Sequence, residues 1–397
     1  MSALISIDYI AAQALQFVLG GAGKQDPESV ILIEPVGDNE YKISTNTGAT
    51  HRHVFVSTNG TVHTVDGDTT GDTTPTCAIR ATALTNAVKL IGEDEVLSMQ
   101  LDDDTVRLSS GAVSFTMDNL YDDVMKVKNP QRTTTLVTTP GDMLISSLNR
   151  AKNTGDPSGD VAFVLSADDS TISVCGGDHI VRSKETIGPV TITEDTTIHI
   201  PKRFIKEVKN DLVTKAGVDI VDIKSDLGVV ELVMRFAAGD VTSVTTCHYT
   251  FPQTVGESTL SAHDPCDEDN NAIFVADKKD IKSSVASVAN VVRGGVPIEV
   301  STSAANNQVT ITATDGDGSA KTVVFNADVS QTSTLVVSPH TLLSSLNCVS
   351  KGQVEIGTLT FEETPYMTIT PLFDDTAEED TTNPDMIVSL AVVSIGE

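Results

Sequence analysis

The sequence predicts an α+β fold in which short helices recur at regular intervals among many strands. Only 4% of the 397 residues are aromatic and none is Trp, so Val, Ile and Leu must fill the cores. Gly, Pro, Asn and Asp divide the chain into short segments rich in Thr and Val, as in strand-rich proteins. Six further segments have helical periodicity. A chain of this length exceeds one ordinary core, so two or three domains are expected.

The six predicted helices begin 60 to 76 residues apart. They are residues 8–24, 79–92, 140–154, 200–217, 276–294 and 338–352. Several begin with a cap or first-turn signal, such as Asp8, Asp277 and Ser338 followed by Pro339, and most end at Gly. Strand-like sequence flanks each one; residues 308–315, for example, alternate apolar and polar side chains. A helix-plus-strands unit is therefore repeated six times along the chain.

Positive charge is concentrated in these helices. The chain has a formal net charge of −29, but the six segments hold 15 of its 26 Lys and Arg and only 6 of its 55 Asp and Glu. This asymmetry predicts that the helices face an anionic partner and that the sheet surface does not. The alternative is a set of ordinary surface helices, since Lys and Arg are good helix formers. The scarcity of acids on most of the helices favours the first interpretation.

Neither the cysteines nor the N-terminus indicates export or a membrane. The five Cys are odd in number and widely scattered, which is typical of a reducing cytoplasm. The apolar start of the chain has no Lys or Arg before it and is interrupted by Asp8, which favours a buried strand and a helix over a signal peptide. No stretch approaches the roughly 18 apolar residues of a membrane span. We expect a soluble cytoplasmic protein.

The patterns that suggest catalysis or metal binding are incomplete. His51 and His53 lie on one side of a predicted strand without a third ligand nearby in the sequence, so a surface role is expected. The acidic runs at 102–104 and 374–380 lack the Gly and the closing Glu of an EF-hand. A second group has the residue types of a zinc site, but its spacing in the sequence matches no established pattern of tetrahedral zinc ligands: Cys247, His248, His263 and Cys266. A P-loop and the common hydrolase motifs are absent. We therefore expect no enzyme, no cofactor and no metal.

Four stretches resemble the bacterial DNA polymerase III β sliding-clamp family. Residues 79–120 combine a helix, an acidic turn and alternating strands that close on "SSGAVSF", and "TIHIPKRFIKEVKNDL" at 197–212 matches the start of a later unit. "ISVCGGDHIVRSKETIG" at 172–188 is similar to the family's stretch with a characteristic His, and "YTFPQTVG" at 249–256 to its Phe-Pro turn. The order of these stretches carries the resemblance, which extends loosely over nearly the whole chain.

The resemblance implies three similar domains, at 1–129, 130–265 and 266–397, each made of two helix-plus-strands units. It also implies a ring-shaped homodimer with continuous outer sheets and with helices lining a hole for duplex DNA. The DNA would be contacted through its phosphates only, without base readout. The residues expected to face DNA are Lys24, Arg80, Lys89, Arg150, Lys152, Lys202, Arg203, Lys206, Lys209, Lys215, Lys278, Lys279 and Lys282.

The resemblance further implies a pocket that binds short apolar peptides of a DNA polymerase and a clamp loader. Its expected residues are His179, Ile180, Val181, Pro252, Met386, Ile387, Val388 and Leu390. The sequence departs from the family pattern here, because Gly177 and Asp178 reverse the expected Asp-Gly, no Arg follows Pro252 in the expected place, and the C-terminal Pro and Arg are missing. The peptide preference is therefore expected to differ.

Two other classes of protein are alternatives. A β-rich virion component fits the acidic, aromatic-poor composition but not the six basic helices. A metal-dependent enzyme would use the Cys and His group named above. The departures from the cellular pattern are compatible with a phage-type clamp in an infected host as well as a bacterial one. The acidity fits either adaptation to high salt or the ordinary acidity of a clamp.

Overall fold

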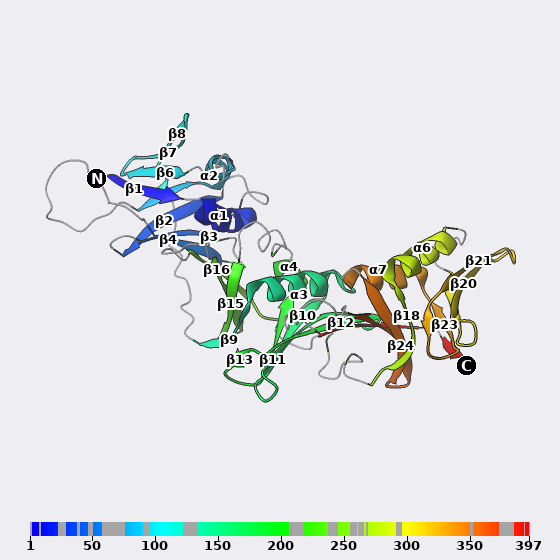
Figure 1. The fold of residues 1–397 in the computed structure, drawn as a ribbon. Coiled ribbons are helices and arrows are strands. Elements are labelled where there is room, and N and C mark those ends of the chain that lie inside the picture. Colours follow the sequence, from blue (N-terminus) through cyan, green and yellow to red (C-terminus); the bar gives the residue numbers. More distant parts are fainter. Residues whose placement is uncertain are drawn as a thin grey trace. The chain divides into compact units, whose positions relative to one another are not determined.

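The computed structural model forms two compact units, each described by itself below (Figure 1). Unit 1 consists of residues 1–145 and 207–253, and unit 2 of residues 146–206 and 254–397. The structure describes residues 2–7, 9–22, 29–37, 40–46, 51–57, 76–89, 96–121, 134–205, 208, 218–226, 228–236, 245–254, 260, 266, 269–290, 296–349, 352–372, 385–392 and 394–396.

Unit 1 contains a four-stranded antiparallel sheet in the order β1-β6-β7-β8. Its strands are β1 (Ser2–Ile7), β6 (Leu97–Asp102), β7 (Thr105–Ser110) and β8 (Val113–Asp118). Burial alternates along β6 because one face of the sheet packs on the core. Strand β8 ends the sheet, and its side chains are almost all exposed.

A longer antiparallel sheet of unit 1 runs in the order β9-β15-β16-β17-β4-β3-β2-β5. Its strands are β9 (Thr135–Pro140), β15 (Val218–Asp226), β16 (Val229–Phe236), β17 (Thr245–Pro252), β4 (His51–Ser57), β3 (Glu40–Asn46), β2 (Val30–Gly37) and β5 (Cys77–Arg80). Helix α1 (Tyr9–Ala22) packs on β3, β4 and β17 and contacts α2 (Ala81–Val88). Tyr41, Tyr249 and Phe251 are fully buried, so the few aromatic residues are used in this core.

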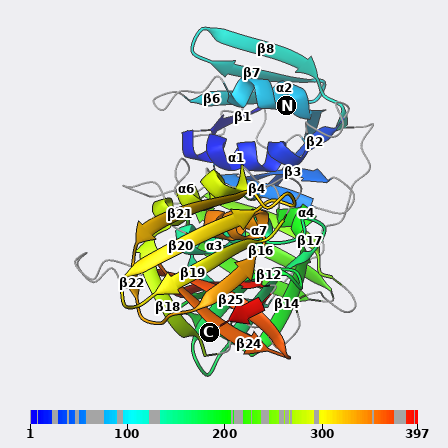
Figure 2. The same ribbon diagram turned by 90° about the vertical axis from the view of Figure 1, so that its right-hand side faces the viewer.

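Unit 2 also contains a long sheet, in the order β14-β10-β11-β12-β26-β25-β24-β18-β22. Its strands are β14 (Thr196–Pro201), β10 (Asp160–Ser166), β11 (Thr171–Gly177), β12 (Val181–Ile187), β26 (Asp385–Ala391), β25 (Thr364–Leu372), β24 (Gln353–Phe361), β18 (Asn271–Asp277) and β22 (Asp328–Val329). A second sheet, facing the viewer in Figure 2, runs in the order β21-β20-β19-β23-β27. Its strands are β21 (Ala320–Asn326), β20 (Gln308–Thr314), β19 (Ile298–Ser303), β23 (Thr334–Val337) and β27 (Ser394–Gly396). The short strand β13 is Thr191–Ile192.

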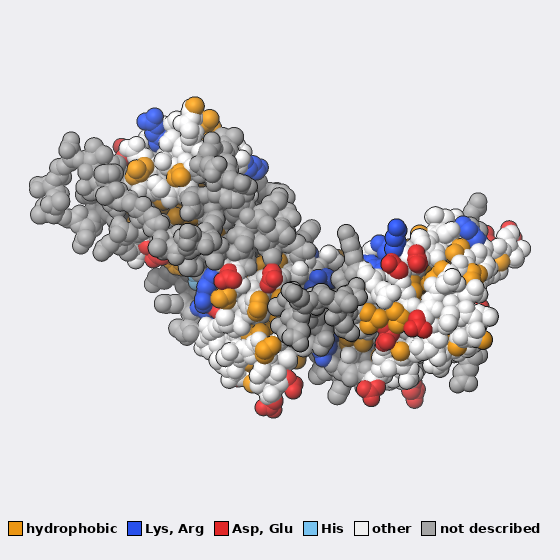
Figure 3. Space-filling view, in the orientation of Figure 1, with side chains coloured by type: hydrophobic (Ala, Val, Ile, Leu, Met, Phe, Trp, Pro, Cys, Tyr) orange, Lys and Arg blue, Asp and Glu red, His pale blue; other side chains and the backbone are white. Residues whose placement is uncertain are grey.

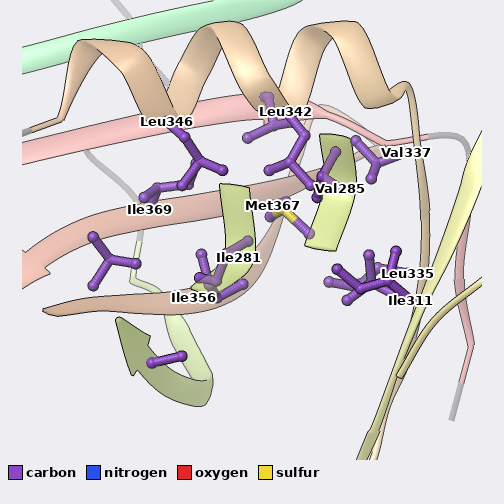
Figure 4. Close-up of a cluster of buried hydrophobic side chains, with 14 of the residues drawn as sticks. Ile281, Val285, Ile311, Leu335, Val337, Leu342, Leu346, Ile356, Met367 and Ile369 are labelled. Carbon is purple, nitrogen blue, oxygen red and sulfur yellow. The ribbon is translucent and has the colours of Figure 1, made fainter. Parts of the chain in front are cut away.

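The core of unit 2 lies where two helices meet both sheets. The helices of this unit are the C-terminal part of α3 (Gly141–Asn153), α4 (Lys202–Ile205), α6 (Lys278–Ala289) and α7 (Pro339–Cys348). Ile281 of α6 and Leu342 of α7 point into a cluster with Ile356, Met367 and Ile369 of the long sheet (Figure 4). The branched aliphatic side chains thus fill this core almost without aromatic residues, as the composition predicts.

All six predicted helices begin within two residues of their predicted starts, and two predicted caps are confirmed. The Asp277 carboxylate accepts a hydrogen bond from the backbone N–H of Lys279, and the Ser338 hydroxyl accepts one from that of Thr341. The predicted cap Asp8 lies outside the described residues. Of the fourth predicted helix the structure describes α4 (Lys202–Ile205), and residues 200 and 201 belong to the end of β14.

The long sheets pair strands that are far apart in the sequence. In unit 1 β17 pairs with β4, with His248 opposite His53, and in unit 2 β12 pairs with β26, with Val181 opposite Leu390. These pairings join segments on opposite sides of the predicted domain boundaries, as continuous sheets require. The three-domain division at 129/130 and 265/266 itself stays a prediction.

Candidate functional site

The basic residues predicted to face DNA differ in exposure. Lys24, Lys206, Lys209 and Lys215 lie outside the described residues. Arg80, Lys89, Arg203 and Lys279 are exposed at the surface of their units. Lysine side chains of α6, drawn in blue, lie at the surface of unit 2 in Figure 3. These four exposed residues are therefore the described members of the predicted set that a large anionic partner can reach most easily.

Lys202 is an exception, because its side chain lies in the interior of unit 2. It is only 3% exposed, and its ammonium group donates hydrogen bonds to the backbone carbonyls of Thr154 and, at 2.7 Å, Asp156. Both carbonyls lie just beyond the end of α3, where a cation satisfies otherwise unpaired acceptors. Burial lowers the pKa of Lys202, against the raising effect of Asp178, Asp156 and Asp160. The placement of Lys202 on a DNA-facing surface is therefore revised.

Arg150 is also engaged within unit 2. Its guanidinium donates two hydrogen bonds to the Glu185 carboxylate, one of them from Nε at 2.8 Å, and this links α3 to β12. The Glu185 side chain is 3% exposed, so the pair is nearly removed from water on that side. A bidentate pair of this kind neutralises the arginine and fixes its geometry. Arg150 therefore carries little free charge for an external partner.

Three other lysines of the helices donate hydrogen bonds to neutral acceptors. The Lys278 ammonium donates to the Val349 carbonyl, and that of Lys282 donates to the Asn347 side chain at 2.7 Å. Both acceptors lie at the C-terminal end of α7 or just beyond it, so α6 and α7 are joined there. On α3, Lys152 donates to Asn149 in the same way. These contacts orient the three lysines.

Seven of the eight residues predicted for the peptide pocket belong to unit 2, on the turn before β12, at the start of β12 and on β26. The Asp178 carboxylate accepts hydrogen bonds from the backbone N–H groups of Ile180 and Val181, at 2.8 and 2.9 Å, and so holds the turn before β12. His179 and Ile180 are exposed on this turn. The backbone N–H of Ala391 in β26 donates to the Ile180 carbonyl at 2.8 Å. The turn and β26 therefore lie side by side.

A cavity of about 320 Å³ lies next to this pair of strands. Its lining residues are Lys184, Thr186, Cys266, Thr370, Pro371, Met386 and Ile387. Met386 and Ile387 are in the predicted set, whereas Val388 and Leu390 are fully buried in the core and Pro252 belongs to unit 1. Lys184 and Thr370 are not in the set predicted from the sequence, because only the register of β12, β26 and β25 brings them to this cavity.

A separate polar cluster lies on the long sheet of unit 1. The rings of His53 and His248 are stacked with centroids 4.2 Å apart, and the Glu231 carboxylate is 3.0 Å from Nδ1 of His248. Burial, followed by the neighbouring His248, His51 and Lys42, lowers the pKa of His53 to about 2. The pKa of His51 falls to about 4, mainly through burial. Both imidazoles are therefore neutral at pH 7.

The Cys and His group considered for a metal-dependent enzyme does not converge within unit 1. Cys247 and His248 are adjacent in β17, so their side chains point to opposite faces of the sheet. The Cys247 thiol is fully buried, and burial raises its pKa. Cys266 belongs to unit 2, and His263 lies outside the described residues.

Comparison with known proteins identifies the fold. No protein-family model and no curated protein matches the sequence. Solved structures match along its whole length. The DnaN sliding clamp (DNA polymerase III subunit beta) from Pseudomonas aeruginosa, bound to griselimycin, is 12% identical with a TM-score of 0.73, over 99% of this chain and 100% of that chain. The DNA polymerase III beta subunit from Thermotoga maritima is 13% identical with a TM-score of 0.73, over 99% of both chains.

A third structure, the Helicobacter pylori beta clamp in complex with diflunisal, is 14% identical with a TM-score of 0.69, over 98% of this chain and 100% of that chain. The chain therefore has the sliding-clamp fold. The solved proteins that share it are bacterial DNA polymerase III β subunits, which confirms the fold class and the family resemblance predicted from the sequence. In the part of the chain that the structure describes, no helix is long and apolar enough to cross a membrane.

The buried position of Lys202 predicts a structural role. Replacement of Lys202 by Met should lower the free energy of unfolding by about 1–3 kcal/mol, because the carbonyls of Thr154 and Asp156 would lose their donor. The matched change Lys279→Met, at an exposed position, should alter it by less than about 0.5 kcal/mol. Urea denaturation of the two variants measures the difference. Equal stabilities would mean that Lys202 does not hold this turn.

Proposed function

We propose that this protein is a DNA sliding clamp that encircles duplex DNA as a ring-shaped homodimer and tethers a DNA polymerase. The observation that carries the proposal is the match to β-clamp structures over 99% of this chain and 100% of the clamp chain. A processivity factor of this kind has no catalytic residues and acts in the cytoplasm of a bacterium or of a phage-infected cell.

The distribution of charge supports contact with the DNA backbone. The chain is strongly acidic overall, and more than half of its Lys and Arg lie in the six predicted helical segments. Helix lysines such as Lys279 and Lys282 would meet phosphates without reading bases. Diffuse contacts of this kind hold the ring near the DNA axis and still allow sliding. From the residues predicted to face DNA, the proposal retains the exposed and half-buried ones. It also retains Lys24, Lys206, Lys209 and Lys215, and it omits Lys202 and Arg150.

Two free sheet edges support closure into a dimer. Strand β8 ends one sheet of unit 1 and exposes Val113 and Phe115, each 42% exposed. Strand β21 ends one sheet of unit 2 and exposes Val324 at 52%. Apolar side chains on an unpaired edge favour the addition of another strand. Pairing β8 of one protomer with β21 of the next gives a head-to-tail interface, which closes when two copies complete a ring.

The dimer is tested by the mass of the protein in solution. Light scattering across a dilution series should give twice the chain mass of 41.9 kDa. The Phe115→Asp variant should shift toward the monomer, because a charge would enter the apolar edge. Val164→Asp, at a residue that is 37% exposed on the internal strand β10, is the control and should remain a dimer. A stable trimer, or a dimer unaffected by Phe115→Asp, would contradict this interface.

The DNA contact is tested by the salt dependence of binding. Arg203→Gln and Lys279→Gln should each reduce the slope of log affinity against log salt concentration by about 1, because each removes one phosphate contact. Arg107→Gln, at an exposed residue of the strand β7, serves as the control and should leave the slope unchanged. Titration of a DNA duplex by fluorescence anisotropy measures the slope. Identical slopes for all three variants would mean that the helix residues do not face DNA.

The partner pocket is tested with a labelled apolar peptide from a DNA polymerase. Ile387→Asp should weaken peptide binding at least about tenfold, because a carboxylate would be desolvated at the cavity wall. The dimer mass should persist in this variant. Val164→Asp again serves as the surface control. Peptide binding that survives Ile387→Asp would place the pocket elsewhere.

A further inference from the structure

The polar cluster of unit 1 assembles from three strands of the long sheet. His53 of β4 lies directly opposite His248 of β17, and Glu231 of β16 lies opposite Thr250, two residues along from His248. His53, His248 and Glu231 therefore occupy the same face of the sheet. His51 lies two residues from His53 on that face, with ring centroids 5.3 Å apart. His53 and His248 are nearly two hundred residues apart in the sequence.

Several polar atoms of the cluster are buried without a hydrogen-bond partner. Among the described residues, Nδ1 of His53 and both ring nitrogens of His51 are buried and unpaired. The His53 side chain is buried, with 7% of the residue exposed, and Glu231 is 6% exposed. Buried polar groups are usually satisfied, and an unmodified His offers at least one nitrogen lone pair. The unpaired nitrogens therefore mark a place where a ligand would complete the coordination of these side chains.

We propose that His53, His248 and Glu231 bind one zinc-class divalent cation on this face of the sheet. One ligand atom from each residue lies within 4.8 Å of those from the other two. A tetrahedral ion with bonds of about 2.0–2.2 Å brings its ligands to about 3.4 Å from one another, so one of the two stacked imidazoles must turn out of the stack to point its nitrogen at the ion. Two imidazoles and one carboxylate are a donor set of zinc, whereas calcium and magnesium prefer oxygen ligands. His51 or a water molecule would take the fourth position.

The electrostatic surroundings suit a cation in part. The Glu231 carboxylate supplies one negative charge next to His248. Lys42 influences both His51 and His53 and opposes a cation, but its ammonium is 3.9 Å from the Glu34 carboxylate. The Glu34 carboxylate thus partly compensates the positive charge of Lys42. A borderline-soft ion that forms strong bonds to imidazole tolerates this environment better than an ion held by charge alone.

The site would join two segments of unit 1 at the β4–β17 seam. Among the described strands, this seam is where the N-terminal strands of the long sheet meet the strands formed by residues 218–252. An ion bound from both sides of the seam would hold the register of the pairing, because metal binding adds its free energy to the folded state only. The proposal depends on strand register in unit 1 and is independent of the clamp function.

Equilibrium dialysis of the chelator-treated full-length chain against Zn²⁺ tests the site. One Zn²⁺ per chain is expected, with a rise in the melting temperature of the loaded protein. His53→Gln and Glu231→Gln should each weaken binding at least about tenfold, as loss of a metal-site residue does. His340→Gln, at an exposed His of α7 in unit 2, is the matched control and should bind as tightly as the wild type.

Binding of Co²⁺ distinguishes this site from the five cysteines. Intense visible bands of tetrahedral Co²⁺ without a thiolate charge-transfer band in the near ultraviolet support the proposed ligands. A thiolate band, substoichiometric binding, or equal affinity of wild type and Glu231→Gln would overturn the proposal. Glu231→Gln changes the volume of the side chain little, so it decides the question even when His53→Gln fails to fold.

Discussion

The antiparallel pairing of strands distant in sequence is the constraint on which the rest of this structure depends. In unit 1 the ladder between β4 and β17 fixes which side chains share a face, and in unit 2 the ladder between β12 and β26 does the same. A shift of one residue in either ladder would turn every side chain of the strand to the opposite face. The histidine cluster and the cavity next to Met386 and Ile387 both exist only in the observed registers.

The charges of the helices separate into two groups with different physical roles. Arg150 and Lys202 form hydrogen bonds inside unit 2: Arg150 donates to a carboxylate, and Lys202 donates to two backbone carbonyls. Lys279 and Arg203 remain at the surface, in a chain with a formal net charge of −29. A clamp needs weak attraction inside its ring and repulsion elsewhere, because tight contacts would slow sliding and external ones would trap DNA unproductively. The proposed function requires only the surface group.

The sequence predicts local features of this protein better than its long-range ones. Helix positions, the caps Asp277 and Ser338, and the alternation along β20 follow from neighbouring residues, and the order of the family-like stretches led to the correct fold. The burial of Lys202 was not predictable, because its helix has an amphipathic pattern and the carbonyls that it satisfies lie more than forty residues earlier. His51 and His53 had no third ligand in the sequence, since Glu231 joins them only through the β4–β17 and β16–β17 ladders.

The central claim is that two chains close into a ring wide enough for duplex DNA. Electron microscopy of the purified protein, with averaging of single particles, tests it most directly. The proposed function predicts closed rings that contain two chains and surround a central hole wider than a DNA duplex. Separate crescents at every concentration, or chains stacked into open filaments, would contradict the claim and would remove the basis for a sliding mechanism.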